Sequence, residues 1–184
     1  MKTKILLGAA VASLVLASSV SAETILWTLQ NAVFDDGGMA SGSFEYNTVT
    51  MAYTDINFTT TNGTTLNGST YTAEDPQSVP RDSGFGAITA PGATADGDPL
   101  LDINAGTGDF TTPGTVVIGN PGTFQSSEGT CTDTDCDLFF ADRSLSGNVV
   151  GVAVPEPATW AMMLVGFGGL GLAIRRRRAA ALTA

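Results

Sequence analysis

The sequence of 184 residues contains no histidine and only two cysteines. The absence of histidine removes the commonest general base and metal ligand of enzymes. It also excludes a serine nucleophile activated by histidine, and no Gly-x-Ser-x-Gly elbow is present. Basic residues are almost missing between Glu23 and Val154, where Arg81 and Arg143 are the only two. This segment therefore lacks the basic stripe of a nucleic-acid-binding protein, and we expect no nucleic-acid partner.

Acidic residues dominate the charge, and the net charge is −10. Such a charge favours solubility and attracts cations. Glycosidases need only two carboxylates, but they need a defined pair, and abundance alone does not supply one. Asp82-Ser83-Gly84 resembles the aspartic-protease triplet, yet it occurs once and follows Arg81, whereas that chemistry needs two aspartates. We therefore expect a turn at this position and a protein that is not an enzyme, with a secreted hydrolase as an alternative.

The first 22 residues have the layout of a secretory signal peptide. Lys2 and Lys4 precede an apolar run from Ile5 to about Val20, and small residues end at Ala22. This pattern predicts a signal helix over residues 1–22 that is cleaved after Ala22. The alternative is a retained membrane anchor.

Residues 158–174 are apolar and uncharged. As a helix they would be about 25 Å long, slightly short of a hydrocarbon core of about 30 Å. Trp160 and the arginines of residues 175–178 can extend the span, because indole and guanidinium groups prefer the interface. The positive-inside rule keeps these arginines in the cytoplasm, so the preceding body lies outside the inner membrane. Pro155 and Pro157 favour an extended, accessible link before the helix.

The C-terminal stretch resembles the PEP-CTERM sorting signal in its PEPxxWA variant. Its residues are Pro155, Glu156, Pro157, Trp160, the glycine-rich run 166–171, and Arg175, Arg176, Arg177 and Arg178. The resemblance implies processing by an exosortase-type enzyme of Gram-negative bacteria. It also implies association with exopolysaccharide, biofilm and the cell surface. A plain membrane anchor that is never processed is the alternative.

The middle of the chain, residues 23–153, has the sequence pattern of an exported β-rich domain. Runs such as Thr24–Phe34 alternate, and turn residues such as Asp35–Gly38 separate them. We predict a mainly β fold: a small antiparallel β-sandwich-like body with long loops. Long surface loops are expected at about residues 72–97, and closing strands at Thr115–Ile118, Leu138–Ala141 and Asn148–Val154. The division is thus 1–22 signal peptide, 23–153 domain and 154–184 sorting signal.

Cys131 and Cys136 are expected to form a disulfide, because an exported chain meets an oxidising compartment. Between and beside them, Asp133, Asp135 and Asp137 alternate. Calcium prefers several carboxylate oxygens on a bent loop, so these aspartates are weak candidates for a calcium site. A solvated acidic loop without metal is the main expectation, and no other cofactor is expected.

Taken together, these features predict a non-enzymatic protein that is first anchored in the inner membrane with its body in the periplasm. It is then delivered to the cell surface or the extracellular matrix. The alternative is a carbohydrate-binding β-sandwich module. Its candidate stacking residues are Trp27, Tyr46, Tyr53 and Tyr71, although such aromatic residues are more often part of a core.

Overall fold

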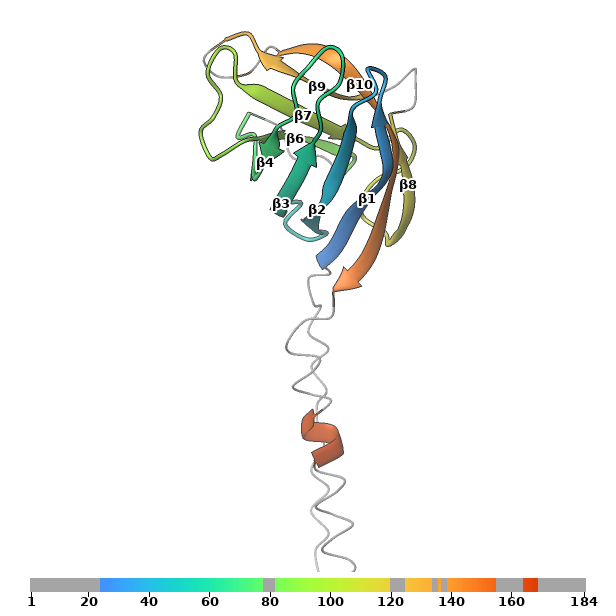
Figure 1. Ribbon diagram of the computed structural model, residues 1–184. Coiled ribbons are helices and arrows are strands. Elements are labelled where there is room, and N and C mark those ends of the chain that lie inside the picture. Colours follow the sequence, from blue (N-terminus) through green and yellow to red (C-terminus); the bar gives the residue numbers. More distant parts are fainter. Residues whose placement is uncertain are drawn as a thin grey trace, which may run out of the picture.

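The computed structural model of the protein describes residues 24–77, 82–119, 125–133, 136, 139–154 and 164–168. Ten strands follow one another along the chain (Figure 1). They are β1 (Thr24–Phe34), β2 (Met39–Asn47), β3 (Tyr53–Thr60), β4 (Thr70–Tyr71), β5 (Ala73–Glu74), β6 (Gly84–Ile88), β7 (Pro99–Asn104), β8 (Gly114–Ile118), β9 (Ser126–Cys131) and β10 (Phe139–Val154).

All ten strands belong to one antiparallel sheet in the order β4-β3-β2-β1-β10-β9-β7-β6-β5, with β8 also paired to β10. The two edge strands, β4 and β5, are separated only by Thr72, and β3 and β5 lie in contact. The sheet therefore curls until its two edges almost meet (Figure 1). The prediction of a mainly β, antiparallel fold is confirmed. The sandwich is not, because the described strands do not divide into two sheets.

Strand β10 is the longest strand and joins the two walls of the curled sheet (Figure 1). Its first part pairs with β9, its second part pairs with β8, and most of its length pairs with β1. The two closing strands expected at Leu138–Ala141 and Asn148–Val154 are thus one strand, although Leu138 itself lies outside the described residues. The polar residues between them hid this continuity, because Arg143 is buried inside the sheet and breaks the apolar pattern.

The long surface loops expected at residues 72–97 are interrupted by two strands, β5 and β6, while the other described residues of this range lie in turns and loops. Every residue of β6 is buried, so it shows none of the alternation that identifies a half-exposed strand. Gly84 approaches β7 so closely that a Cβ would lie 2.0 Å from Oδ1 of Asn104. Gly84 is therefore needed for the close approach of β6 to β7, although a glycine at such a position weakens the prediction of a strand from sequence.

One hydrophobic cluster fills the curled sheet. The alternation in β1 buries Ile25, Trp27 and Leu29, as predicted. Phe44 of β2 lies at the centre of an aromatic group, with its ring centroid 5.0 Å from Phe85 and 5.3 Å from Phe110. Such edge-to-face pairs contribute about 0.5–1.5 kcal/mol each beyond the burial of their area.

The first and last residues of the sheet lie side by side. Thr24 pairs with Val154 of β10 on one side and with Asn47 of β2 on the other (Figure 1). The predicted signal helix over residues 1–22 lies outside the described residues, as does most of the predicted spanning helix. Residues 164–168, inside that segment, are helical. Among the residues that the structure describes, no helix is long and apolar enough to cross a membrane.

Candidate functional site

The sorting-signal residues follow directly after the sheet. Strand β10 ends at Val154, and Pro155 is the next residue in the chain. The positions predicted for recognition lie outside the described residues: Pro155, Glu156, Pro157, Trp160, Arg175, Arg176, Arg177 and Arg178. The structure therefore fixes the place where this signal leaves the body, which is the end of the sheet where Thr24 begins β1.

Cys131 and Cys136 form a disulfide, with their Cα atoms 4.8 Å apart. Both are buried, in a small cluster with Ile88 and Leu100 that lies apart from the main core. The amide of Cys131 donates to the carbonyl of Asp98 at 2.9 Å, so the closed loop is held against the turn that precedes β7. The disulfide therefore stabilises a part of the sheet that the aromatic core does not reach.

The calcium candidates are only partly visible. Asp133 is described and half-buried, and its Oδ1 makes no hydrogen bond to any described residue. Asp135 and Asp137 lie outside the described residues. No group of three or more metal-ligating side chains occurs within the described part of the chain. Calcium binding by this loop stays a prediction.

The aromatic residues considered for sugar stacking are in the core, so that assignment is wrong. Trp27, Tyr46 and Tyr71 are 0 % exposed, and Tyr53 is 4 % exposed. A sugar ring can stack only on an accessible aromatic face. Side chains that alternate along a strand share one face, but the sequence could not show which face is covered.

Asp82, from the single Asp-Ser-Gly triplet, lies in a turn as predicted. Its carboxylate accepts a hydrogen bond from the Tyr46 hydroxyl, and its carbonyl accepts one from the amide of Phe110 at 2.7 Å. Burial of Tyr46, together with the hydrogen bond to Asp82, raises the pKa of the phenol well above its ordinary value. The triplet thus fastens the segment before β6 to the core, because it links that segment to both Tyr46 and Phe110.

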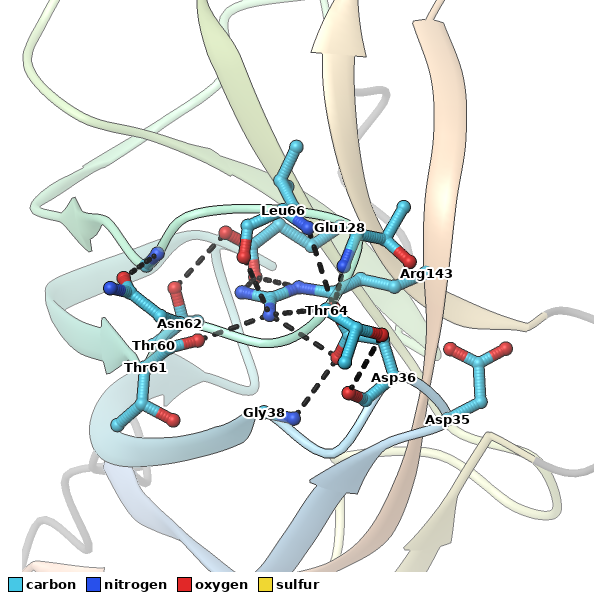
Figure 2. A network of polar contacts seen from close by, with 12 residues as sticks. Asp35, Asp36, Gly38, Thr60, Thr61, Asn62, Thr64, Leu66, Glu128 and Arg143 are labelled. Atoms are coloured by element: carbon cyan, nitrogen blue, oxygen red, sulfur yellow. Dashed lines mark hydrogen bonds and ion pairs between the residues drawn. The ribbon is translucent and has the colours of Figure 1, made fainter.

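A buried ion-pair network surrounds Arg143 (Figure 2). The guanidinium is fully buried, and its Nη2 lies 2.7 Å from Oε2 of Glu128 on β9. Its Nη1 lies 3.3 Å from Oδ2 of Asp36 in the β1–β2 turn. The same nitrogen donates to the carbonyl of Thr61, after β3, at 3.0 Å. The Arg143 side chain also lies over the ring of Phe34, 4.0 Å from its centroid.

Glu128 is fully buried and fully engaged. Its Oε2 faces Arg143, while its Oε1 accepts hydrogen bonds from the hydroxyls of Tyr71 at 2.6 Å and Thr60 at 3.0 Å. Burial and the negative charge of Glu128 raise the pKa of the Tyr71 phenol above its usual range. Tyr71 therefore remains a neutral donor at any physiological pH.

Asp36 receives amide donors from its own turn and from the loop after β3 (Figure 2). The amides of Gly38, Thr65 and Leu66 donate to its carboxylate at 3.0, 3.2 and 3.4 Å. Burial acts to raise the pKa of Asp36, but these amides and Arg143 together hold it below the ordinary value. Gly63 lies so close that a Cβ there would be 2.0 Å from Oδ2 of Asp36.

The network is a clamp, since one cation fastens β9, β10, the β1–β2 turn and the loop after β3. Within this network the two carboxylates are paired with the one guanidinium. Sequence reasoning assigned no role to Arg143. The one feature of the sequence that could have indicated this role is the position of Arg143 in β10, on the same inward face of the strand as Leu145 and Val149. Its partners Glu128 and Asp36 are 15 and 107 positions away, so no local pattern could identify them.

Comparison with known proteins gives one match. Residues 153–178 match the family described as the PEP-CTERM protein-sorting motif. Neither the curated proteins nor the solved structures give a significant match to the chain. The match begins at the last two residues of β10 and continues through the segment that follows the sheet. The chain therefore carries a PEP-CTERM sorting motif directly behind its β-sheet, which supports an exported protein that is membrane-anchored before processing and sorted by an exosortase system.

Proposed function

We propose that this protein is a non-enzymatic surface or extracellular-matrix protein, which an exosortase-type enzyme processes at its sorting motif. In this proposal the signal peptide is cleaved after Ala22 and the segment 158–174 spans the inner membrane. The arginines of residues 175–178 remain in the cytoplasm, and the acidic body lies in the periplasm. Processing then releases the body to the cell surface or the matrix, where it associates with exopolysaccharide.

The observation that carries the proposal is the position of the sorting motif relative to the sheet. The motif begins as β10 ends, and Thr24, two residues after the expected cleavage at Ala22, pairs with Val154. All ten strands lie between these two points. Cleavage at both places would therefore remove the targeting segments and leave every strand in the mature body.

Three of the described carboxylates are engaged in holding the fold together. The buried carboxylates of Glu128 and Asp36 neutralise Arg143, and the carboxylate of Asp82 accepts the Tyr46 hydroxyl. These three carboxylates hold turns and loops onto the sheet.

The experiment that tests the proposal is mass spectrometry of the C-terminus of the protein isolated from cells with and without the processing enzyme. We expect a mature chain that ends near residues 155–157 only when the enzyme is present. Replacement of Arg175–Arg178 by serine should reduce membrane retention and processing, because the positive stop against export is missing. Substitution of the exposed Val117 by threonine serves as the matched control and should leave processing unchanged. An intact C-terminus in enzyme-containing cells would contradict the proposal.

A further inference from the structure

The exposed apolar side chains of the body are not evenly distributed. The described sheet and turns expose nine large apolar side chains, and five of them lie at the end of the sheet where both chain ends meet. We call these five residues the terminal apolar group: Leu26, Val49, Met51, Val152 and Val154.

The pairing register places the terminal apolar group together. Leu26 pairs with Val152, and one step nearer the end of the sheet Thr24 pairs with Val154. Thr24 also pairs with Asn47, the last residue of β2, so the β2–β3 turn that carries Val49 and Met51 begins beside the same end (Figure 1). Neighbouring strands are about 4.8 Å apart, so Asn47 and Val154 lie only about 10 Å from each other.

Met51 in the β2–β3 turn has an unfavourable backbone conformation. Its φ of 56° lies in the left-handed region, which glycine and asparagine adopt far more readily than methionine. The Asn47 side chain holds the turn by accepting the amides of Val49 and Thr50 at 3.0 and 2.9 Å. An exposed methionine in an unfavourable conformation points to a use for its side chain, because backbone strain concentrates at functional sites.

Charge is scarce at this end of the sheet, although it is not absent from the strands that form it. The segments 24–34, 46–54 and 144–154 contain no acidic or basic residue, although the protein as a whole is strongly acidic. Glu45 of β2 pairs with Leu26, and Asp55 of β3 interacts with Glu45, so two carboxylates lie at the inner edge of the terminal apolar group. Acidic surface is repelled by anionic lipid headgroups, so the outermost part of this end, from Thr24 and Val154 to the β2–β3 turn, is the part of this body that can approach them.

The short segment between the sheet and the predicted membrane span limits how far this end of the sheet can lie from the bilayer. Three residues, 155–157, separate Val154 from the apolar segment that begins at Ala158. The four Cα–Cα steps from Val154 to Ala158 can span at most about 14 Å. The headgroup layer on each side of a bilayer is about 5–8 Å thick. If the segment 158–174 spans the membrane, the end of β10 lies within or directly above the headgroups.

We propose that the terminal apolar group rests on the lipid surface and orients the body while the tail is still attached. This inference rests on the membrane anchoring in the proposed function. The short tether keeps the group at a high effective concentration near the lipid, so a few partly exposed side chains suffice for contact. When processing cuts the tether that advantage is lost, and the same weak contact no longer retains the body.

The test uses the full chain in vesicles of phosphatidylethanolamine and phosphatidylglycerol, with a photo-crosslinking residue at one position at a time. Positions 51 and 152 probe the terminal apolar group. Positions 39 and 117 are the matched controls, since Met39 and Val117 are also exposed, 55 % and 47 %, but lie elsewhere. Met39 pairs with Val33, which is about 30 Å along β1 from Thr24 at about 3.3 Å per residue.

We expect lipid adducts at positions 51 and 152 and a yield roughly tenfold lower at 39 and 117. Met51→Gly should leave the melting temperature equal or higher, because glycine suits this φ. It should nevertheless lower the adduct yield at position 152 several-fold, a change that a merely structural residue would not cause. Equal yields at all four positions would overturn the inference. The inference would also be overturned if these positions crosslinked to a protein in enzyme-containing cells but gave no lipid adducts in vesicles. That result would indicate that the group docks onto the enzyme.

Flotation of the vesicles separates this inference from the proposed function. A chain that does not float with the vesicles contradicts the membrane anchoring and the inference together. A chain that floats but gives no lipid adducts at positions 51 and 152 contradicts the inference alone. Val152→Thr provides a second measurement. We expect it to lower the yield of lipid adducts at position 51 roughly tenfold, because one aliphatic contact with the lipid is lost.

Discussion

Replacing Arg143 by methionine removes the only cation from the buried network while keeping most of the side-chain volume. Glu128 and Asp36 are then left as neighbouring carboxylates inside the sheet, with side-chain exposures of 0 % and 3 %. Removing one partner of a buried ion pair typically costs about 3–5 kcal/mol. A domain of this size is stable by about 5–15 kcal/mol in total. The variant should therefore lose a large fraction of its stability.

Urea unfolding of residues 23–154 measures this loss directly. Trp27 is the only tryptophan in that segment and is fully buried, so its emission reports the core. Glu128→Gln gives the decisive comparison. It should destabilise the parent protein, because it weakens the pair, but stabilise Arg143→Met, because it removes an uncompensated charge.

Two results would refute this reasoning. One is a loss of less than about 1 kcal/mol for Arg143→Met, which is the size of an exposed ion pair. The other is the same destabilisation by Glu128→Gln in both backgrounds, which would show that the two residues are not coupled. The exposed Val117→Thr is the control and should change the free energy of unfolding by no more than about 0.5 kcal/mol.

Three further predictions concern pH and the disulfide. All three tyrosines of the protein are buried, and each has a raised pKa, so stability is complete below pH 10.0, the ordinary tyrosine value, and falls as pH rises above it. Phenolate absorbance should appear together with unfolding; titration of a folded protein near pH 10 would contradict the burial. The lowered pKa of Asp36 has the opposite consequence, because its contribution is complete above the ordinary value of 3.8 and is lost as pH falls through the lower folded value. Melting temperatures from pH 6 to pH 2 should fall less steeply for Asp36→Asn, and an identical slope would count against the network. Removal of the disulfide by Cys131→Ser and Cys136→Ser should lower the free energy of unfolding by about 2 kcal/mol, the chain-entropy value for so short a loop, as measured by urea unfolding against the parent.

Local sequence patterns predicted the parts of the fold that local physics controls. The alternation of β1, the turn at Asp35–Gly38 and the strand β8 were all identified, because side-chain period and turn chemistry operate over a few residues. The buried strand β6 was missed because burial on both faces removes the alternation. The alternation of β1 includes Trp27, but whether its face of the strand meets sugar or core depends on strands far away in the chain.

The sequence by itself determined that the body is β-rich and acidic and that a PEP-CTERM sorting motif follows it, since composition, period and a contiguous motif are properties of neighbouring residues. Only the tertiary structure decided that the strands form one curled sheet and that Arg143 is clamped by Glu128 and Asp36. It also decided that Thr24 lies beside Val154. Each of these facts is a contact between residues remote in the chain, and such contacts are fixed by how the whole chain closes around one core, which no short segment encodes.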